Sequence, residues 1–109
     1  MLEPLLGSLN AERCLLFLFG REQGYATEIA KHFDTDLYGI QKQLDKFENS
    51  GVLASSQVGR TRVYRFSPRY AFHAELQALL KKALAFCEPA ERDRLMIVRR
   101  RPRRRGKPL

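Results

Sequence analysis

Residues Ala26–Leu53 read ATEIAKHFDTDLYGIQKQLDKFENSGVL, and the fold that we expect follows from the pattern of this segment. Apolar residues recur in it at the spacing of a helix face: Ile29, Ala30 and Phe33, and then Leu37, Ile40, Leu44 and Phe47. Such spacing predicts two helices that each bury one side. Between them lies a polar break, Asp34-Thr35-Asp36, in which Asp36 is the expected N-cap of the second helix. A short helix, a tight break and a longer helix in this order predict a helix-turn-helix.

The second predicted helix, at about 36–50, has a polar face opposite its apolar stripe. That face and the preceding turn supply the first candidate nucleic-acid contacts: Thr35, Tyr38, Gly39, Gln41, Lys42 and Lys46. Phenol, amide and ammonium groups can contact base edges and phosphates in a major groove. Glycine weakens a helix, so Gly39 indicates close approach of another backbone. The alternative is that this face is simply solvated, as most polar helix faces are.

After Gly51 the hydrophobic pattern changes from a helical period to a period of two. Residues 52–58 and 62–66 have this period and flank Gly59-Arg60-Thr61, so they predict a β-hairpin. Arg60, Thr61 and Arg62 at its tip are further candidate contacts, because a guanidinium group suits a phosphate or a narrow minor groove. The alternative is an edge hairpin whose charges discourage aggregation. Its position directly after a helix-turn-helix favours a DNA-contacting wing.

Two further helices are expected to complete the core. Asn10 is the expected cap of a helix over Ala11–Phe19 that is apolar nearly all round and therefore central. A last helix over about Tyr70–Phe86 has an apolar stripe along its length. This stripe and the N-terminal leucines predict a dimer interface made of Leu2, Leu5, Leu6, Phe72, Leu76, Leu79, Leu80, Ala83 and Phe86. The alternative is that the stripe packs on the first helix of its own chain.

Length and charge limit the possible organisation. A chain of 109 residues suffices for one small domain. The net charge is +8, but Arg99–Lys107 holds seven of the 20 Lys and Arg and none of the 12 Asp and Glu, which leaves residues 1–98 with a net charge of +1. We therefore expect a folded domain over residues 1–88 and a basic, disordered tail over residues 89–109. The tail would attract any polyanion; a solubilising end or an arm for another anionic partner are the alternatives.

Other classes of protein find little support in the sequence. There is no apolar run of the roughly 20 residues that a membrane span needs, and the N-terminus lacks the features of a signal peptide, so we expect a cytoplasmic protein. Cys14 and Cys87 are expected to be free, buried thiols. His32 and His73 belong to no catalytic motif, and no ligand set for a metal is recognisable. We expect neither an enzyme nor a cofactor.

The predicted order of elements resembles the winged helix-turn-helix domains of bacterial transcription regulators of the arsenic-repressor type. The resemblance covers about Leu6 to Phe86, and the wing sequence GRTRVYRF at Gly59–Phe66 is its most specific part. Leu6-Gly7-Ser8-Leu9 and Ser67–Phe72 look closer to winged-helix modules fused ahead of small nucleotidyltransferase domains. The resemblance implies a homodimer that places two recognition helices on a palindromic site. Metal-sensing members of this group use a cysteine pair in the recognition helix, or histidines and carboxylates on the last helix. Here the recognition helix has no cysteine and the last helix offers only His73, Glu75 and Cys87, so metal sensing is not expected.

The expected fold is mainly α with a small β-hairpin (α+β), a winged helix-turn-helix. The expected function is sequence-specific binding of double-stranded DNA as a dimeric transcription regulator. The helix at about 36–50 would enter the major groove, and the wing at 59–62 would contact the backbone or the minor groove. The alternative is a protein-interaction module that recruits a partner, such as a separate nucleotidyltransferase, without reading DNA. The near-neutral charge of residues 1–98 favours this alternative.

Overall fold

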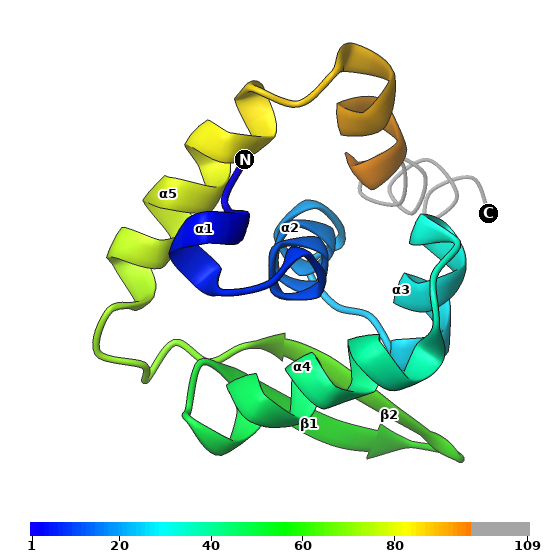
Figure 1. Ribbon diagram of the computed structural model, residues 1–109. Coiled ribbons are helices and arrows are strands. Elements are labelled where there is room, and N and C mark those ends of the chain that lie inside the picture. The colour runs from blue at the N-terminus through cyan, green and yellow to red at the C-terminus, as the bar shows by residue number, and fades with distance from the viewer. Residues whose placement is uncertain (97–109) are drawn as a thin grey trace, which may run out of the picture.

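The computed structural model describes residues 1–96 and confirms the expected α+β winged helix-turn-helix. The elements in chain order are α1 (Glu3–Leu6), α2 (Leu9–Arg21), α3 (Ala26–Phe33), α4 (Leu37–Asn49), β1 (Leu53–Val58), β2 (Thr61–Phe66) and α5 (His73–Ala85). Residues 89–96 are also helical. Figure 1 shows the arrangement around α2, which is viewed nearly end-on. In this described part of the chain, no helix combines the length and apolar character needed to cross a bilayer.

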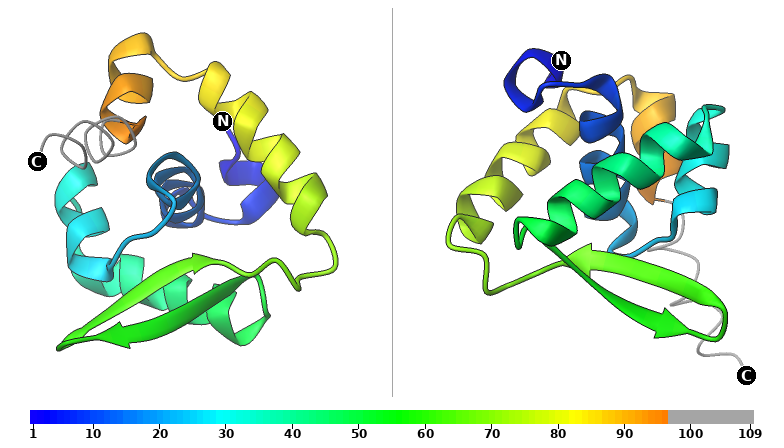
Figure 2. Two further views of the ribbon diagram at one scale, coloured as in Figure 1. Left: turned by 180° about the vertical axis from the view of Figure 1, so that it is seen from behind. Right: turned by 60° about the horizontal axis from the view of Figure 1, so that its bottom comes forward.

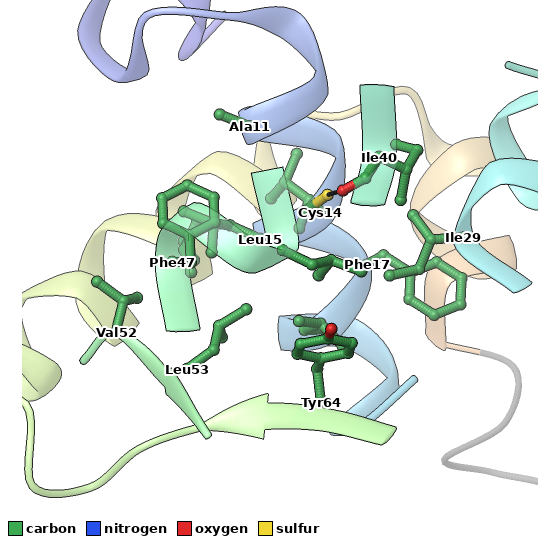
Figure 3. Close-up of a cluster of buried hydrophobic side chains, with 14 of the residues drawn as sticks. Ala11, Cys14, Leu15, Phe17, Ile29, Ile40, Phe47, Val52, Leu53 and Tyr64 are labelled. Atoms are coloured by element: carbon green, nitrogen blue, oxygen red, sulfur yellow. Dashed lines mark hydrogen bonds between the residues drawn. The ribbon is translucent and has the colours of Figure 1, made fainter. Parts of the chain in front are cut away.

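Helix α2 is the centre of the core, as its composition predicts. The side chains of Cys14, Leu15, Phe17 and Leu18 are almost completely buried. Helices α1, α3, α4 and α5 all contact α2, and the close-up in Figure 3 shows side chains of α4 and the hairpin gathered against it. Burial of one large apolar side chain stabilises a domain by about 1.5–3 kcal/mol. A helix that is apolar all round can therefore hold all the other elements together.

The start of α2 differs from the prediction that Asn10 caps it. Ser8 is the N-cap: its backbone is extended, and its Oγ accepts a hydrogen bond of 2.9 Å from the backbone N–H of Ala11. Asn10 lies within the helix, where its Oδ1 accepts from Arg13 Nη1 at 3.0 Å. The sequence offers two good capping residues two positions apart, and periodicity alone does not choose between them.

Helices α3 and α4 form the predicted helix-turn-helix, with two local differences. Asp36 is the N-cap residue of α4, but its side chain makes no capping hydrogen bond. Leu37, predicted in the buried stripe, is 46% exposed, whereas Ile40, Leu44 and Phe47 are buried. The helical period predicts which face turns inward, but it does not predict where along the helix the core begins.

The hairpin has the predicted turn, and the side chains of its strands alternate between the two faces as predicted. Strands β1 and β2 are antiparallel with Val58 opposite Thr61, so only Gly59 and Arg60 form the turn. Gly59 has φ +63°, a conformation that two-residue hairpin turns require and that glycine adopts without strain. Tyr64 faces inward and is 1% exposed, and its backbone pairs with Gly24. This pairing attaches the hairpin to the segment between α2 and α3.

The end of the fold differs from the predicted domain boundary at residue 88. Leu95, in the helix at 89–96, is 1% exposed and belongs to the core. Arg21 donates to the carbonyl oxygens of Leu95 (3.2 Å) and Arg94 (3.0 Å). Gly20 makes room for this contact, since a Cβ there would lie 2.8 Å from the Leu95 oxygen. The predicted boundary is wrong, because the core continues to at least Leu95. The arginine cluster of the predicted tail lies outside the described residues.

The helix at 89–96 is also held by His32 of α3. His32 Nε2 lies 3.3 Å from Glu91 Oε2, and its ring packs edge-on against Phe17 and Phe33. Burial lowers the pKa of His32 below its ordinary value of 6.5, although the hydrogen bond and charge of Glu91 act in the opposite direction. The packing around His32 therefore favours the neutral form of the histidine. This preference stabilises the folded protein fully when the pH is above 6.5, and the stabilisation decreases as the pH falls below that value.

Candidate nucleic-acid interface

The polar face of α4 is free of the rest of the described chain at three of the predicted positions. Tyr38 is 72% exposed, and Lys42 and Lys46 are exposed. These residues follow one another at intervals of four, so they form a line along one side of the helix. Helix α4 runs beside the hairpin on the same side of the molecule, as the right panel of Figure 2 shows. One surface thus includes both an exposed helix face and the wing.

A cleft of about 310 Å³ joins α3, α4 and the wing. It is lined by Tyr25, Ala26, Thr27, Gln41, Arg60, Thr61, Arg62 and Tyr64. Four of these, at positions 41 and 60–62, are predicted contacts, whereas the residues from the start of α3 have no pattern in the sequence that indicates their role. Two guanidinium groups and several hydroxyl groups around one opening can donate hydrogen bonds to an anion such as a phosphate.

The exposed cations of this surface are not committed to carboxylates. Among the described residues, the ion pairs involve the N-terminal amine, Arg21, His32 and Arg94. None of them involves Lys42, Lys46 or Arg60. A lysine or arginine that already has a carboxylate partner must lose it before it can neutralise a phosphate, whereas these three need not.

Gly39 and Gln41 have different surroundings from those predicted. Gly39 is half-buried, and a Cβ on it would lie 2.6 Å from Asn10 Nδ2. The close approach inferred from this glycine is real, but it comes from a side chain of α2. Gln41 Nε2 donates to Asp45 Oδ1 (2.9 Å) and to the hydroxyl of Tyr64 (3.1 Å). Both of its amide hydrogens are used within the protein, so Gln41 connects α4 to the wing. Its contact with bases stays a prediction.

Two carboxylates on α4 face the hairpin, and their contacts with it were not among the sequence predictions. Asp45 accepts from Gln41 and from the Tyr64 hydroxyl, and Glu48 Oε2 accepts from Ser55 Oγ at 2.6 Å. Burial raises the pKa of Tyr64, and the nearby Asp45 and Glu48 raise it further, against the effect of the Gln41 hydrogen bond. Tyr64 therefore stays protonated and can donate. The sequence could have indicated these hydrogen bonds, because positions 41, 45 and 48 lie on one side of a helix.

The two threonines lie at the edges of this surface. Thr35 is half-buried, and its backbone N–H donates to the carbonyl of Ala30 at 3.0 Å in the turn between α3 and α4. Thr61 is half-buried at the start of β2 and lines the cleft. Thr35 is therefore separate from the cleft, whereas Thr61 belongs to it.

The predicted dimer residues divide into three groups. Leu2, Leu80 and Ala83 are buried within the chain itself, as in the alternative of packing on the first helix. For Leu80, which is 0% exposed, the assignment to a dimer interface is wrong, whereas Leu2 and Ala83 still line a surface cleft. Leu6, Leu76 and Leu79 are partly buried against the core. Leu5, Phe72 and Phe86 are 67%, 62% and 73% exposed. A helical stripe in so small a domain can serve its own core and a second surface at once, and only the packing separates the two.

The two cysteines differ in burial. Both are free thiols, and Cys14 is buried as predicted, whereas Cys87 is only half-buried. Burial raises the pKa of Cys14 to about 12 and also raises that of Cys87, so both are unreactive thiols at neutral pH. In residues 1–96, no three His, Cys, Asp or Glu side chains gather in a way that could hold a metal ion.

Comparison with known proteins identifies the fold. The sequence matches no protein-family profile and no curated protein. The structure is similar to ZitR of Lactococcus lactis in a mutant apo form, with a TM-score of 0.54, 16% identity, and coverage of 72% of this chain and 62% of ZitR. It is also similar to a MarR-family protein of Mycobacterium tuberculosis, with a TM-score of 0.52, 20% identity, and coverage of 97% and 79%.

A third similar structure is the adhesin competence repressor AdcR of Streptococcus pyogenes. Its TM-score is 0.51 at 15% identity, with coverage of 97% of this chain and 86% of AdcR. At such identities the similarity shows the fold alone, a winged helix that this chain has in common with the three proteins. None of these three is described as an arsenic repressor or as a nucleotidyltransferase-associated module, so that narrower resemblance stays a prediction.

Proposed function

We propose that this protein binds double-stranded DNA as a transcription regulator. The observation that carries the proposal is the shared surface on which the exposed line of α4 meets the arginine-lined cleft at the wing. A helix is about 10–12 Å across, which matches a major groove about 12 Å wide. Two of the proteins with similar structures are described as a MarR-family protein and a repressor, which supports the same function.

The proposed contacts divide into base reading and backbone positioning. Tyr38 and Lys42 would face base edges from the first half of α4. Lys46, Arg60 and Arg62 would contact phosphates, which carry no sequence information but fix the orientation of the protein on the duplex. The folded part is nearly neutral, so its affinity must come from this local grouping of cations and not from overall charge.

Alanine substitutions test this division. In the full chain, Arg60→Ala should weaken binding to all duplexes alike and reduce the slope of log affinity against log salt by about 0.9, because one phosphate contact is lost. Lys42→Ala should instead change the preferred sequence. The measurement is selection of duplexes from a random pool, followed by titration of selected and random duplexes at several salt concentrations. Equal losses on both kinds of duplex in both variants would refute the division.

We further propose a homodimer formed through α1 and α5. Leu5 of α1 and Phe86, the residue directly after α5, are exposed. A cleft of about 220 Å³ is lined by Leu2, Leu79, Lys82, Ala83 and Phe86 together with Met1. Large exposed apolar side chains beside an apolar cleft are typical of an interaction surface. A dimer would present two copies of α4, as a palindromic site requires.

Introducing charges at that surface tests the dimer. Leu5→Glu with Phe86→Glu should convert a dimer into a monomer in sedimentation velocity, because two carboxylates would have to be desolvated at the interface. Leu37→Glu, which changes another exposed apolar residue, is the matched control and should leave the oligomeric state unchanged. A wild-type chain that sediments as a monomer at high concentration would exclude this interface.

One observation supports the alternative, which is a protein-interaction module that acts beside a partner such as a nucleotidyltransferase. Without the arginine cluster, the net charge of residues 1–98 is only +1. The selection experiment discriminates between the two functions, because a module that does not read DNA would enrich no sequence. On either proposal the protein would act in the cytoplasm.

A further inference from the structure

Two short hydrogen bonds connect α4 to Arg62 through a serine of the hairpin. Ser55 Oγ donates to Glu48 Oε2 at 2.6 Å, and the same oxygen accepts from Arg62 Nη1 at 2.7 Å. A hydroxyl has one hydrogen and two lone pairs, and a carboxylate can only accept. The carboxylate therefore takes the hydrogen of Ser55, which leaves a lone pair of the serine for the guanidinium.

The three residues of this chain differ in exposure. Glu48 and Ser55 are half-buried, whereas Arg62 is exposed and lines the cleft. Ser55 lies opposite Tyr64 in the hairpin, so both face α4, and the period of two in β2 puts Arg62 on that same face. A guanidinium has five N–H donors. Ser55 accepts from one of them, so the other donors of this cleft-lining side chain remain for a ligand.

We propose that Glu48 and Ser55 are positioning residues that hold Arg62 ready to receive a DNA phosphate. This inference rests on the proposed function. A long, unrestrained arginine loses rotamer freedom when it binds, and immobilising such a side chain lowers affinity by about two- to tenfold. A guanidinium that is already held loses less. This role explains why a carboxylate lies on a surface that faces a polyanion, because its oxygen accepts a hydrogen bond from a serine of the same molecule.

A double-mutant cycle at Ser55 and Arg62 tests the proposal. Ser55 is chosen because Ser55→Ala removes the connecting oxygen without changing the charge. In the full chain, measured by fluorescence anisotropy on a duplex selected by the wild-type protein, Ser55→Ala should reduce affinity about two- to tenfold. In the Arg62→Ala background the same change should have no effect. Equal losses in both backgrounds would show that Ser55 does not act through Arg62 and would overturn the proposal.

The salt dependence separates positioning from direct contact. Arg62→Ala should reduce the slope of log affinity against log salt by about 0.9, whereas Ser55→Ala should leave the slope unchanged, because Arg62 still reaches the phosphate. A reduced slope in Ser55→Ala would overturn the positioning role. Glu48→Gln keeps an oxygen acceptor for Ser55 and should bind more tightly than Glu48→Ala; the reverse order would count against the role of Glu48.

Ser56→Ala is the matched control on the same strand. Ser56 lies on the other face of the hairpin, where its Oγ accepts from Arg65 Nη1 at 3.4 Å. Its substitution should change neither affinity nor slope, and a loss equal to that of Ser55→Ala would mean that the hairpin responds to any lost hydroxyl. If the wild-type chain selects no duplex at all, the proposed function fails. If it selects one but Ser55→Ala binds it like wild type, only the positioning role fails.

Discussion

Leu95→Ala is expected to lower the free energy of unfolding by about 2–5 kcal/mol, the range for removing a buried leucine side chain. Leu95 is 1% exposed, and the backbone around it is fixed by Arg21 and Gly20. Small domains have a total stability of about 5–15 kcal/mol, so this change would remove a large part of it. Urea denaturation with an unchanged m value is the measurement.

Leu37→Ala is the control for this effect. Leu37 is 46% exposed and lies outside the proposed dimer surface, so its truncation should cost about 1 kcal/mol or less, as for most surface substitutions. Equal losses in the two variants would mean that the helix at 89–96 does not belong to the cooperative unit.

The burial of Leu95 in the core also determines where the chain can be truncated to remove the basic tail. Truncation after Phe86 would take away Leu95 and the groups that contact Arg21 and His32, so loss of binding would then reflect unfolding. Truncation after Met96 removes all seven cations of Arg99–Lys107 and keeps every core residue of the described chain. If the folded part reads DNA, the shorter chain should retain its preferred sequence with lower overall affinity.

Reversing the two wing charges, Arg60→Glu with Arg62→Glu, is expected to reduce duplex affinity by about a hundredfold or more. Hydrogen bonds to charged groups contribute about 1.5–3 kcal/mol each, and two of them correspond to that factor. The new carboxylates would also repel phosphates across the cleft. Titration at low salt is the most sensitive measurement, since exposed charges are screened least there.

Arg65→Glu with Arg69→Glu is the control for net charge. Both residues are exposed, and neither lines the cleft. The control variant has the same net charge as the wing variant, so any effect of overall charge or of the tail is common to both. If the two double variants lose affinity equally, the wing is not a specific contact and the DNA-binding proposal loses its main support.

The sequence of this protein determined its local elements and their order. Helical spacing over Ala26–Leu53 predicted the helix-turn-helix, and the change to a period of two, with Gly59 at the turn, predicted the hairpin. These are short-range properties: side-chain direction repeats every 3.6 residues in a helix and every two in a strand, and a two-residue turn needs a residue that tolerates positive φ. The composition of α2 likewise predicted that it would be buried on all sides.

Only the tertiary structure decided which surfaces stay free. Leu80 and Leu5 look equivalent as apolar residues of helical stripes, yet one is buried in the core and the other projects into solvent. In the sequence Gln41 is a polar residue on an exposed helix face, but in the structure its amide donates a hydrogen bond to Tyr64, 23 residues away. Leu95 is part of the core only because Gly20 lets its backbone approach α2. Each of these outcomes depends on contacts between residues far apart in the chain, and a local pattern contains no information about them.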